Sequence, residues 1–164
     1  MTTEQETPTG VVTLARANEV AGTGHFWIYA GFVHAVRGQP VTGDLVDVVM
    51  PSGRFYARGL YNPASKIRVR ILTFQEEPIT PAFWRERIAQ AVRLRTRIAS
   101  ETTAYRLIYG EADQLPGLIV DRYDDMIVCP GPISLTQTAT VYCAARQLFP
   151  VVETLLLDHP QSSH

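Results

Sequence analysis

The chain has 164 residues, enough for one domain or two small ones, and 46% of them are apolar, enough to bury a core. A charged fraction of 19% excludes wholesale disorder. No apolar run approaches the roughly 20 residues of a membrane span, and the polar, acidic start is unlike a secretory signal. The two cysteines, Cys129 and Cys143, make neither a disulfide framework nor a metal-binding CxxC motif. We therefore expect a cytoplasmic protein that does not contact membranes.

The net charge of −1 conceals an uneven distribution. Residues 1–53 sum to −3, residues 54–102 to +6 and residues 103–164 to −4. The basic residues are 14 arginines and one lysine, and the planar fork of arginine fits phosphate and stacks on bases. This pattern points to an anionic partner, although a GC-rich genome would also favour arginine.

Short strands are predicted after a polar start. Residues 1–10 are expected to be disordered. The apolar runs 46–50 and 54–61 flank a turn at 51–53, which predicts a β-hairpin.

The segment 67–71 alternates apolar and basic residues. Its three apolar side chains should face a core, and Arg68 and Arg70 should share the opposite face. Several short strands within residues 11–75 predict a small β-barrel.

A helix is predicted next, as a link over residues 80–100. Thr80 is a good N-cap and Pro81 a good first residue, so we expect the helix to run from about 81 to 99. One face is apolar and the other carries Arg85, Arg93 and Arg97. The apolar residues are Trp84, Ile88, Ala91, Val92 and Ile98.

The pattern of residues 103–164 predicts a small, incomplete α+β domain. The predicted elements are a strand at 105–109, a turn at 114–117, a strand pair within 118–128, a helix at 134–149 and a strand at 152–157. The expected fold class is therefore mixed α/β of the α+β kind: a small β-barrel, a linking helix and a small α+β domain.

Catalytic signatures are not found in the sequence. The lone GxG at 22–24 lacks a dinucleotide fingerprint, and there is no P-loop, HExxH or GxSxG. The four histidines show no ligand spacing, so no metal site is predicted. Each cysteine lacks a basic neighbour in sequence and is expected to be a small buried hydrophobe. The acidic clusters would share a proton, bind a cation or cap turns; they comprise Glu111, Asp113, Asp121, Asp124 and Asp125.

The basic residues of the central segment are the strongest candidates for a site. They are interleaved with Phe55, Tyr56 and Tyr61, and such a surface binds phosphates and stacks bases. The alternative is a solvated face paired with acidic parts of the same molecule. The set comprises Arg54, Arg58, Lys66, Arg68 and Arg70.

Three stretches resemble one family. Residues 24–30 (GHFWIYA), 58–72 (RGLYNPASKIRVRIL) and 105–123 (YRLIYGEADQLPGLIVDRY) resemble motifs of the class I SAM-dependent methyltransferases that make 5-methylcytosine in large-subunit ribosomal RNA. The resemblance covers about residues 12–128. Departures from the family pattern are Phe26 for Pro, Tyr109 for His, Gln114 for Gly and Asp125 for Gly.

The resemblance implies an order of domains. In that family an RNA-binding PUA domain precedes a linking helix, a small central domain and a catalytic domain, and this chain resembles the first two domains. The family's SAM-binding and catalytic residues fall in the unmatched part. We therefore expect no catalytic residue and no cofactor in this chain, with S-adenosylmethionine used by the full-length family.

The resemblance also implies that the chain binds structured ribosomal RNA. The five basic residues would neutralise phosphates, with the three helix arginines as an extension. His25 and Trp27 lie in the first motif and would either contact RNA or pack in the barrel. Glu111 and Asp113 are expected to stabilise a turn beside Pro116.

Three other hypotheses stay open at this stage. The chain would instead dock a separately encoded methyltransferase, be a truncated fragment without function, or be a small enzyme using Asp121 or Glu111 with a shifted pKa. A homodimer is compatible with each of them.

Overall fold

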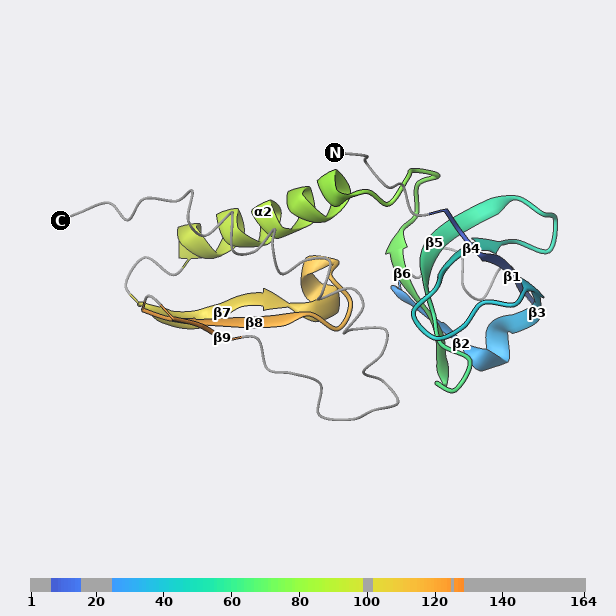
Figure 1. Ribbon diagram of the computed structural model, residues 1–164, viewed down its shortest axis with the longest axis horizontal. Helices are drawn as coiled ribbons and strands as arrows, with labels where there is room; N and C mark the ends of the chain where they lie inside the picture. Colours follow the sequence, from blue (N-terminus) through green and yellow to red (C-terminus); the bar gives the residue numbers. More distant parts are fainter. Residues whose placement is uncertain (1–6, 16–24, 99–101, 125, 129–164) are drawn as a thin grey trace.

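The computed structural model describes residues 7–15, 25–98, 102–124 and 126–128, and strands dominate this part of the chain (Figure 1). Six strands form a sheet in the order β2-β6-β5-β4-β1-β3, in which β1 and β4 are parallel and the other pairs antiparallel. The strands are β1 (Gly10–Leu14), β2 (Trp27–Tyr29), β3 (Val33–Gly38), β4 (Leu45–Val49), β5 (Phe55–Tyr61) and β6 (Ile67–Thr73). A 3₁₀ turn, η1 (Ala30–Phe32), joins β2 to β3, the two end strands of the sheet.

The sheet curls around a first apolar core (Figure 1). The predicted hairpin is confirmed as β4 and β5, closed by the Met50 amide donating to the Arg54 carbonyl over 2.8 Å. The predicted alternation of β6 is confirmed for Val69 and Ile71, which are fully buried in this core, whereas Ile67 at the start of the strand is half-buried. The inner face carries Val12, Leu14, Ile28, Val46, Val48, Met50, Ala57, Tyr61, Val69 and Ile71.

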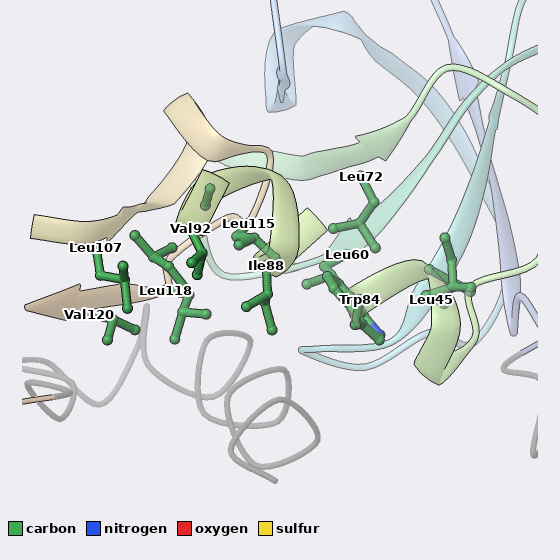
Figure 2. Close-up of a cluster of buried hydrophobic side chains, with 13 residues drawn as sticks. Leu45, Leu60, Leu72, Trp84, Ile88, Val92, Leu107, Leu115, Leu118 and Val120 are labelled. Atoms are coloured by element: carbon green, nitrogen blue, oxygen red, sulfur yellow. The ribbon is translucent and has the colours of Figure 1, made fainter. Parts of the chain in front are cut away.

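A second apolar core lies on the outer side of the same sheet. Leu45, Leu60 and Leu72 project from β4, β5 and β6 and pack with residues of the helix and of a second, smaller sheet (Figure 2). That sheet has the order β7-β8-β9 and consists of β7 (Ala104–Tyr109), β8 (Ile119–Tyr123) and β9 (Met126–Val128). One continuous core therefore joins the two sheets through the helix.

Glycine at position 59 allows β5 and β6 to approach closely. A Cβ atom there would lie 2.3 Å from the Arg70 carbonyl oxygen, far inside contact distance. The β5–β6 register shifts between Arg58 and Gly59, so that Leu60 faces Arg70 across the strands. Any other residue at this position would have to push the two strands apart.

The helix α2 (Pro81–Ile98) agrees closely with its prediction. The Thr80 hydroxyl caps it by accepting a hydrogen bond from the Phe83 amide over 3.2 Å. Four of the five predicted apolar-face residues are buried (Trp84, Ile88, Ala91 and Val92), and the side chain of the fifth, Ile98, lies outside the described ones. No helix in the described ranges is long and apolar enough to span a bilayer.

The second sheet matches the predicted strands at 105–109 and within 118–128. A 3₁₀ turn, η2 (Gly110–Asp113), precedes the turn predicted at 114–117. The predicted helix at 134–149, the predicted strand at 152–157 and both cysteines lie outside the described residues.

The start of the first sheet overlaps the segment that we expected to be disordered. Residues 1–6 lie outside the described part, but Gly10 opens β1. The Thr9 amide donates to the Leu45 carbonyl over 2.9 Å. Pairing with β4 and β3 therefore orders the end of this polar segment.

The shared core predicts that two substitutions on α2 differ sharply. Ile88→Ala removes a side chain that is 1% exposed, and we expect it to lower the free energy of unfolding by about 2–5 kcal/mol. Leu94→Ala, on the same helix but 49% exposed, is the matched control and should change it by less than about 0.5 kcal/mol. Urea unfolding followed by tryptophan fluorescence measures both values. Equal losses in the two variants would contradict a core centred on this helix face.

Candidate functional site

Aromatic and basic side chains gather along the pairing of β2 with β6. Trp27 lies opposite Arg70 in this antiparallel pair. Because Ile28 and Val69 are buried in the inner core, their chain neighbours lie on the outer face. We name this set the β2–β6 strip; it comprises His25, Trp27, Tyr29, Lys66, Arg68 and Arg70.

The rings of the β2–β6 strip contact one another in a row. The centroid of the Trp27 ring lies 5.9 Å from that of His25 and 6.3 Å from that of Tyr29, the latter edge to face. The guanidinium of Arg70 lies over the Trp27 ring at 5.9 Å. A cation so placed is attracted to the face of the indole.

The side chains of the strip fall into two groups by their exposure to solvent. His25, Tyr29 and Lys66 are exposed, whereas Trp27, Arg68 and Arg70 are half-buried. The Arg68 guanidinium donates to the Pro63 carbonyl, which fixes its direction along the β5–β6 loop. Tyr29 was not singled out by the sequence analysis, although it lies within the motif at 24–30; its face became evident only from the pairing of β2.

Glu111 of η2 holds the centre of the strip. Its Oε1 accepts a hydrogen bond from the Trp27 indole over 3.2 Å. The same oxygen forms an ion pair with the Arg70 guanidinium over 2.5 Å. The side chains of Arg70 and Glu111 are 17% and 27% exposed, so water screens the pair only partly. The carboxylate therefore links the first sheet to η2.

A second ion pair holds η2 from the other side. Arg95 of α2 donates two hydrogen bonds to the Asp113 carboxylate, over 2.8 and 2.6 Å. Asp113 also accepts the Tyr109 amide over 2.6 Å, as expected of a residue that stabilises a turn. A turn role was also expected for Glu111. Its side chain instead bonds to two residues that are distant in the sequence: Trp27, which is 84 positions away, and Arg70, which is 41 positions away.

Two members of the predicted basic set lie apart from the strip. Arg58 is only 8% exposed; it pairs with Asp47 over 2.7 Å and donates to the Glu77 carbonyl. Arg54 is exposed in the turn between β4 and β5. Five of the seven predicted site residues thus lie on or next to the β2–β6 pair, and these two do not.

The carboxylate of Asp121 forms a surface ion pair on the second sheet. Hydrogen bonding from Arg106, at 2.8 and 3.1 Å, lowers the pKa of Asp121. A general acid at neutral pH needs a raised pKa, so this carboxylate is unsuited to that role. Within the described ranges, no three His, Cys, Asp or Glu side chains are grouped as metal ligands.

Comparison with known proteins identifies the first sheet. Residues 13–74 match the family described as a PUA-like domain. Residues 13–74 are a PUA-like domain. The β2–β6 strip lies wholly within it.

The resemblance to ribosomal RNA methyltransferases is also confirmed. The chain is 43% identical over 108 residues to ribosomal RNA large subunit methyltransferase I of Shewanella amazonensis, and 45% identical over 109 residues to that of Shewanella denitrificans. Each alignment covers 64% of this chain but only 27% and 28% of the relative. The chain thus spans about a quarter of the curated relatives that it matches.

Solved structures share the fold at low sequence identity. A proposed SAM-dependent methyltransferase from Streptococcus mutans superposes with a TM-score of 0.70 at 14% identity, over 88% of this chain and 37% of its own. A proposed methyltransferase crystallised with SAH gives a TM-score of 0.69 at 15% identity, over 88% and 36%. The arrangement of the two sheets therefore recurs within longer chains.

The contact between the PUA-like domain and η2 predicts energetic coupling. In a double-mutant cycle of Arg70→Gln and Glu111→Gln, we expect a coupling free energy of about 1–2 kcal/mol, because the pair is largely shielded from water. The matched control is the cycle of Glu86→Gln and Arg93→Gln, whose side chains are 59% and 52% exposed and should couple more weakly. Urea denaturation provides the four free energies of each cycle. Coupling no larger than in the control would show that Glu111 does not hold the strip.

Proposed function

We propose that this chain is the RNA-binding part of a large-subunit ribosomal RNA methyltransferase, and that its PUA-like domain docks structured ribosomal RNA. The single observation that carries the proposal is the β2–β6 strip, a row of aromatic and basic side chains within the PUA-like domain. The names of the curated relatives support ribosomal RNA as the partner.

The chemistry of the strip suits RNA. Phosphates are neutralised by Lys66, the last residue of the β5–β6 loop, and by Arg68, near the start of β6. Exposed rings such as Tyr29 offer a face to an unpaired base, which stacks on it without regard to sequence. Trp27, which contacts the Tyr29 ring, and Arg70 are held in place by Glu111. Arg54 would be a separate phosphate contact, and buried Arg58 would support the sheet.

We further propose a division of labour within a longer assembly. A small β-barrel, a linking helix and a small α+β domain would position the RNA, and methyl transfer would use residues other than those described. Three of the acidic residues considered for catalysis or cation binding are engaged in ion pairs, namely Arg70–Glu111, Arg95–Asp113 and Arg106–Asp121, which supports a structural role for them. A cytoplasmic location, expected from the sequence, suits a ribosomal RNA partner.

Lys66→Gln tests the phosphate contact. In filter-binding titrations with an RNA hairpin, the negative slope of log K against log salt should decrease in magnitude by about one, because one counterion-releasing contact is lost. Arg37→Gln, an exposed arginine on β3 at the opposite end of the sheet order, is the matched control and should leave the slope unchanged. An unchanged slope in Lys66→Gln would remove this residue from the interface, and no binding by the parent chain would refute the proposed function.

Tyr29→Ala tests base stacking. We expect RNA affinity to fall about 5- to 100-fold, the range for one stacked base, with the salt slope retained because no charge is lost. The same titrations measure both quantities. Unchanged affinity, or a loss that matches Val36→Ala, a similarly exposed apolar residue on β3, would contradict stacking.

A further inference from the structure

A cavity of about 450 Å³ lies at the start of α2, beside the end of η2. It shares no residue with the β2–β6 strip. Its volume is within the range of small-molecule sites, which is about 300–1,000 Å³. The lining residues used below are Glu77, Phe83, Glu86, Arg87, Gln90 and Gln114.

Gln114 adopts a backbone conformation that favours glycine. Its φ and ψ are 57° and 31°, in the left-handed region, at the end of η2. Residues with a Cβ atom are strained there, and such strain gathers at functional sites. Glycine would adopt this backbone conformation without strain. What Gln114 adds is therefore its side chain, which lines the cavity.

Arg87 and Phe83 form one wall of the cavity. The guanidinium of Arg87 lies 4.8 Å from the centroid of the Phe83 ring. Its Nη2 donates to the Leu72 carbonyl over 3.3 Å, whereas Nη1 is buried without a hydrogen-bond partner among the described residues. A planar guanidinium on an aromatic ring is a surface on which a nucleobase stacks.

The charges of the lining argue against a phosphate. Two carboxylates, those of Glu77 and Glu86, and one guanidinium line the cavity, so the formal charge of its lining is negative. Glu86 also pairs with the exposed Arg93 over 2.8 Å. Glu77 accepts the Thr73 hydroxyl over 2.6 Å, and Glu86 accepts Gln90 over 3.1 Å. Each carboxylate keeps lone pairs for another donor, such as an amino group.

We propose that this cavity binds a single unstacked nucleobase that carries an exocyclic amino group. The base stacks on the wall formed by Arg87 and Phe83, and its edge bonds to the amides of Gln90 and Gln114 and to an acidic side chain. This inference rests on the proposed function, since it takes the base from the bound RNA. It assigns the cavity a second role in RNA binding, in which the strip provides general affinity and the cavity selects a base.

Free nucleosides test the chemistry of the cavity. We would titrate the ¹⁵N-labelled 164-residue chain with adenosine, cytidine, uridine and inorganic phosphate, following the amide signals of Phe83 and Gln114. Adenosine and cytidine should shift these signals and bind at least about fivefold more tightly than uridine, about one net hydrogen bond. Equal binding of uridine, or shifts with phosphate alone, would overturn the inference.

The substitution Gln114→Gly distinguishes an effect of the side chain on binding from an effect on the stability of the fold. It relieves the positive φ, so thermal stability should be retained, while adenosine binding should weaken at least about fivefold. Asp124→Gly is the matched control, since Asp124 has a φ of 55° in the turn between β8 and β9 and does not line the cavity. It should keep both stability and adenosine binding. Full adenosine affinity in Gln114→Gly would contradict the inference.

The RNA hairpin distinguishes this inference from the proposed function. If the parent chain binds the hairpin with a salt-dependent affinity but no nucleoside shifts the cavity signals, the cavity assignment fails and the proposed function stands. If the hairpin does not bind, the proposed function fails as well.

Discussion

The apolar contact on the outer side of the first sheet is the constraint on which the arrangement of the molecule depends. Leu45, Leu60 and Leu72 would be exposed if the first sheet stood alone, and burying three such side chains stabilises by several kcal/mol. The helix and the second sheet provide the partners, among them Trp84 and Ile88 (Figure 2). Because a close-packed interface permits few alternative arrangements, this contact fixes where η2 lies relative to the PUA-like domain.

The position of η2 then organises both candidate sites. On one side Glu111 reaches Trp27 and Arg70 at the centre of the β2–β6 strip. At its other end Gln114 extends into the cavity beside α2. Asp113 anchors the turn to the helix through Arg95. The turn η2 and its C-cap residue thus lie between the β2–β6 strip and the cavity, the two sites for which we propose roles in RNA binding.

The basic residues of the central segment differ in their exposure and in their partners. Lys66 remains exposed, whereas Arg58 and Arg70 form ion pairs with Asp47 and Glu111. The interpretation of a face paired with acidic residues of the same molecule therefore holds for Arg58 and Arg70, and the phosphate contact of Lys66 stays a prediction. The outer side of β5 and β6 is partly covered by η2 and the segment before α2, so a basic residue there needs an acidic or carbonyl partner.

Local chemistry alone determined much of this protein. The alternation in β6, the turn between β4 and β5, the Thr80 cap and the apolar face of α2 each depend on neighbours a few residues apart, so the sequence predicted them correctly. The family motifs also indicated the PUA-like domain. Only the tertiary structure decided that Leu72 faces a second core, that Glu111 reaches Trp27 across 84 positions, and that Gln114 lines a cavity. These contacts depend on how the two sheets pack against each other, and that packing is the outcome of many long-range contacts, which no local pattern of residues records.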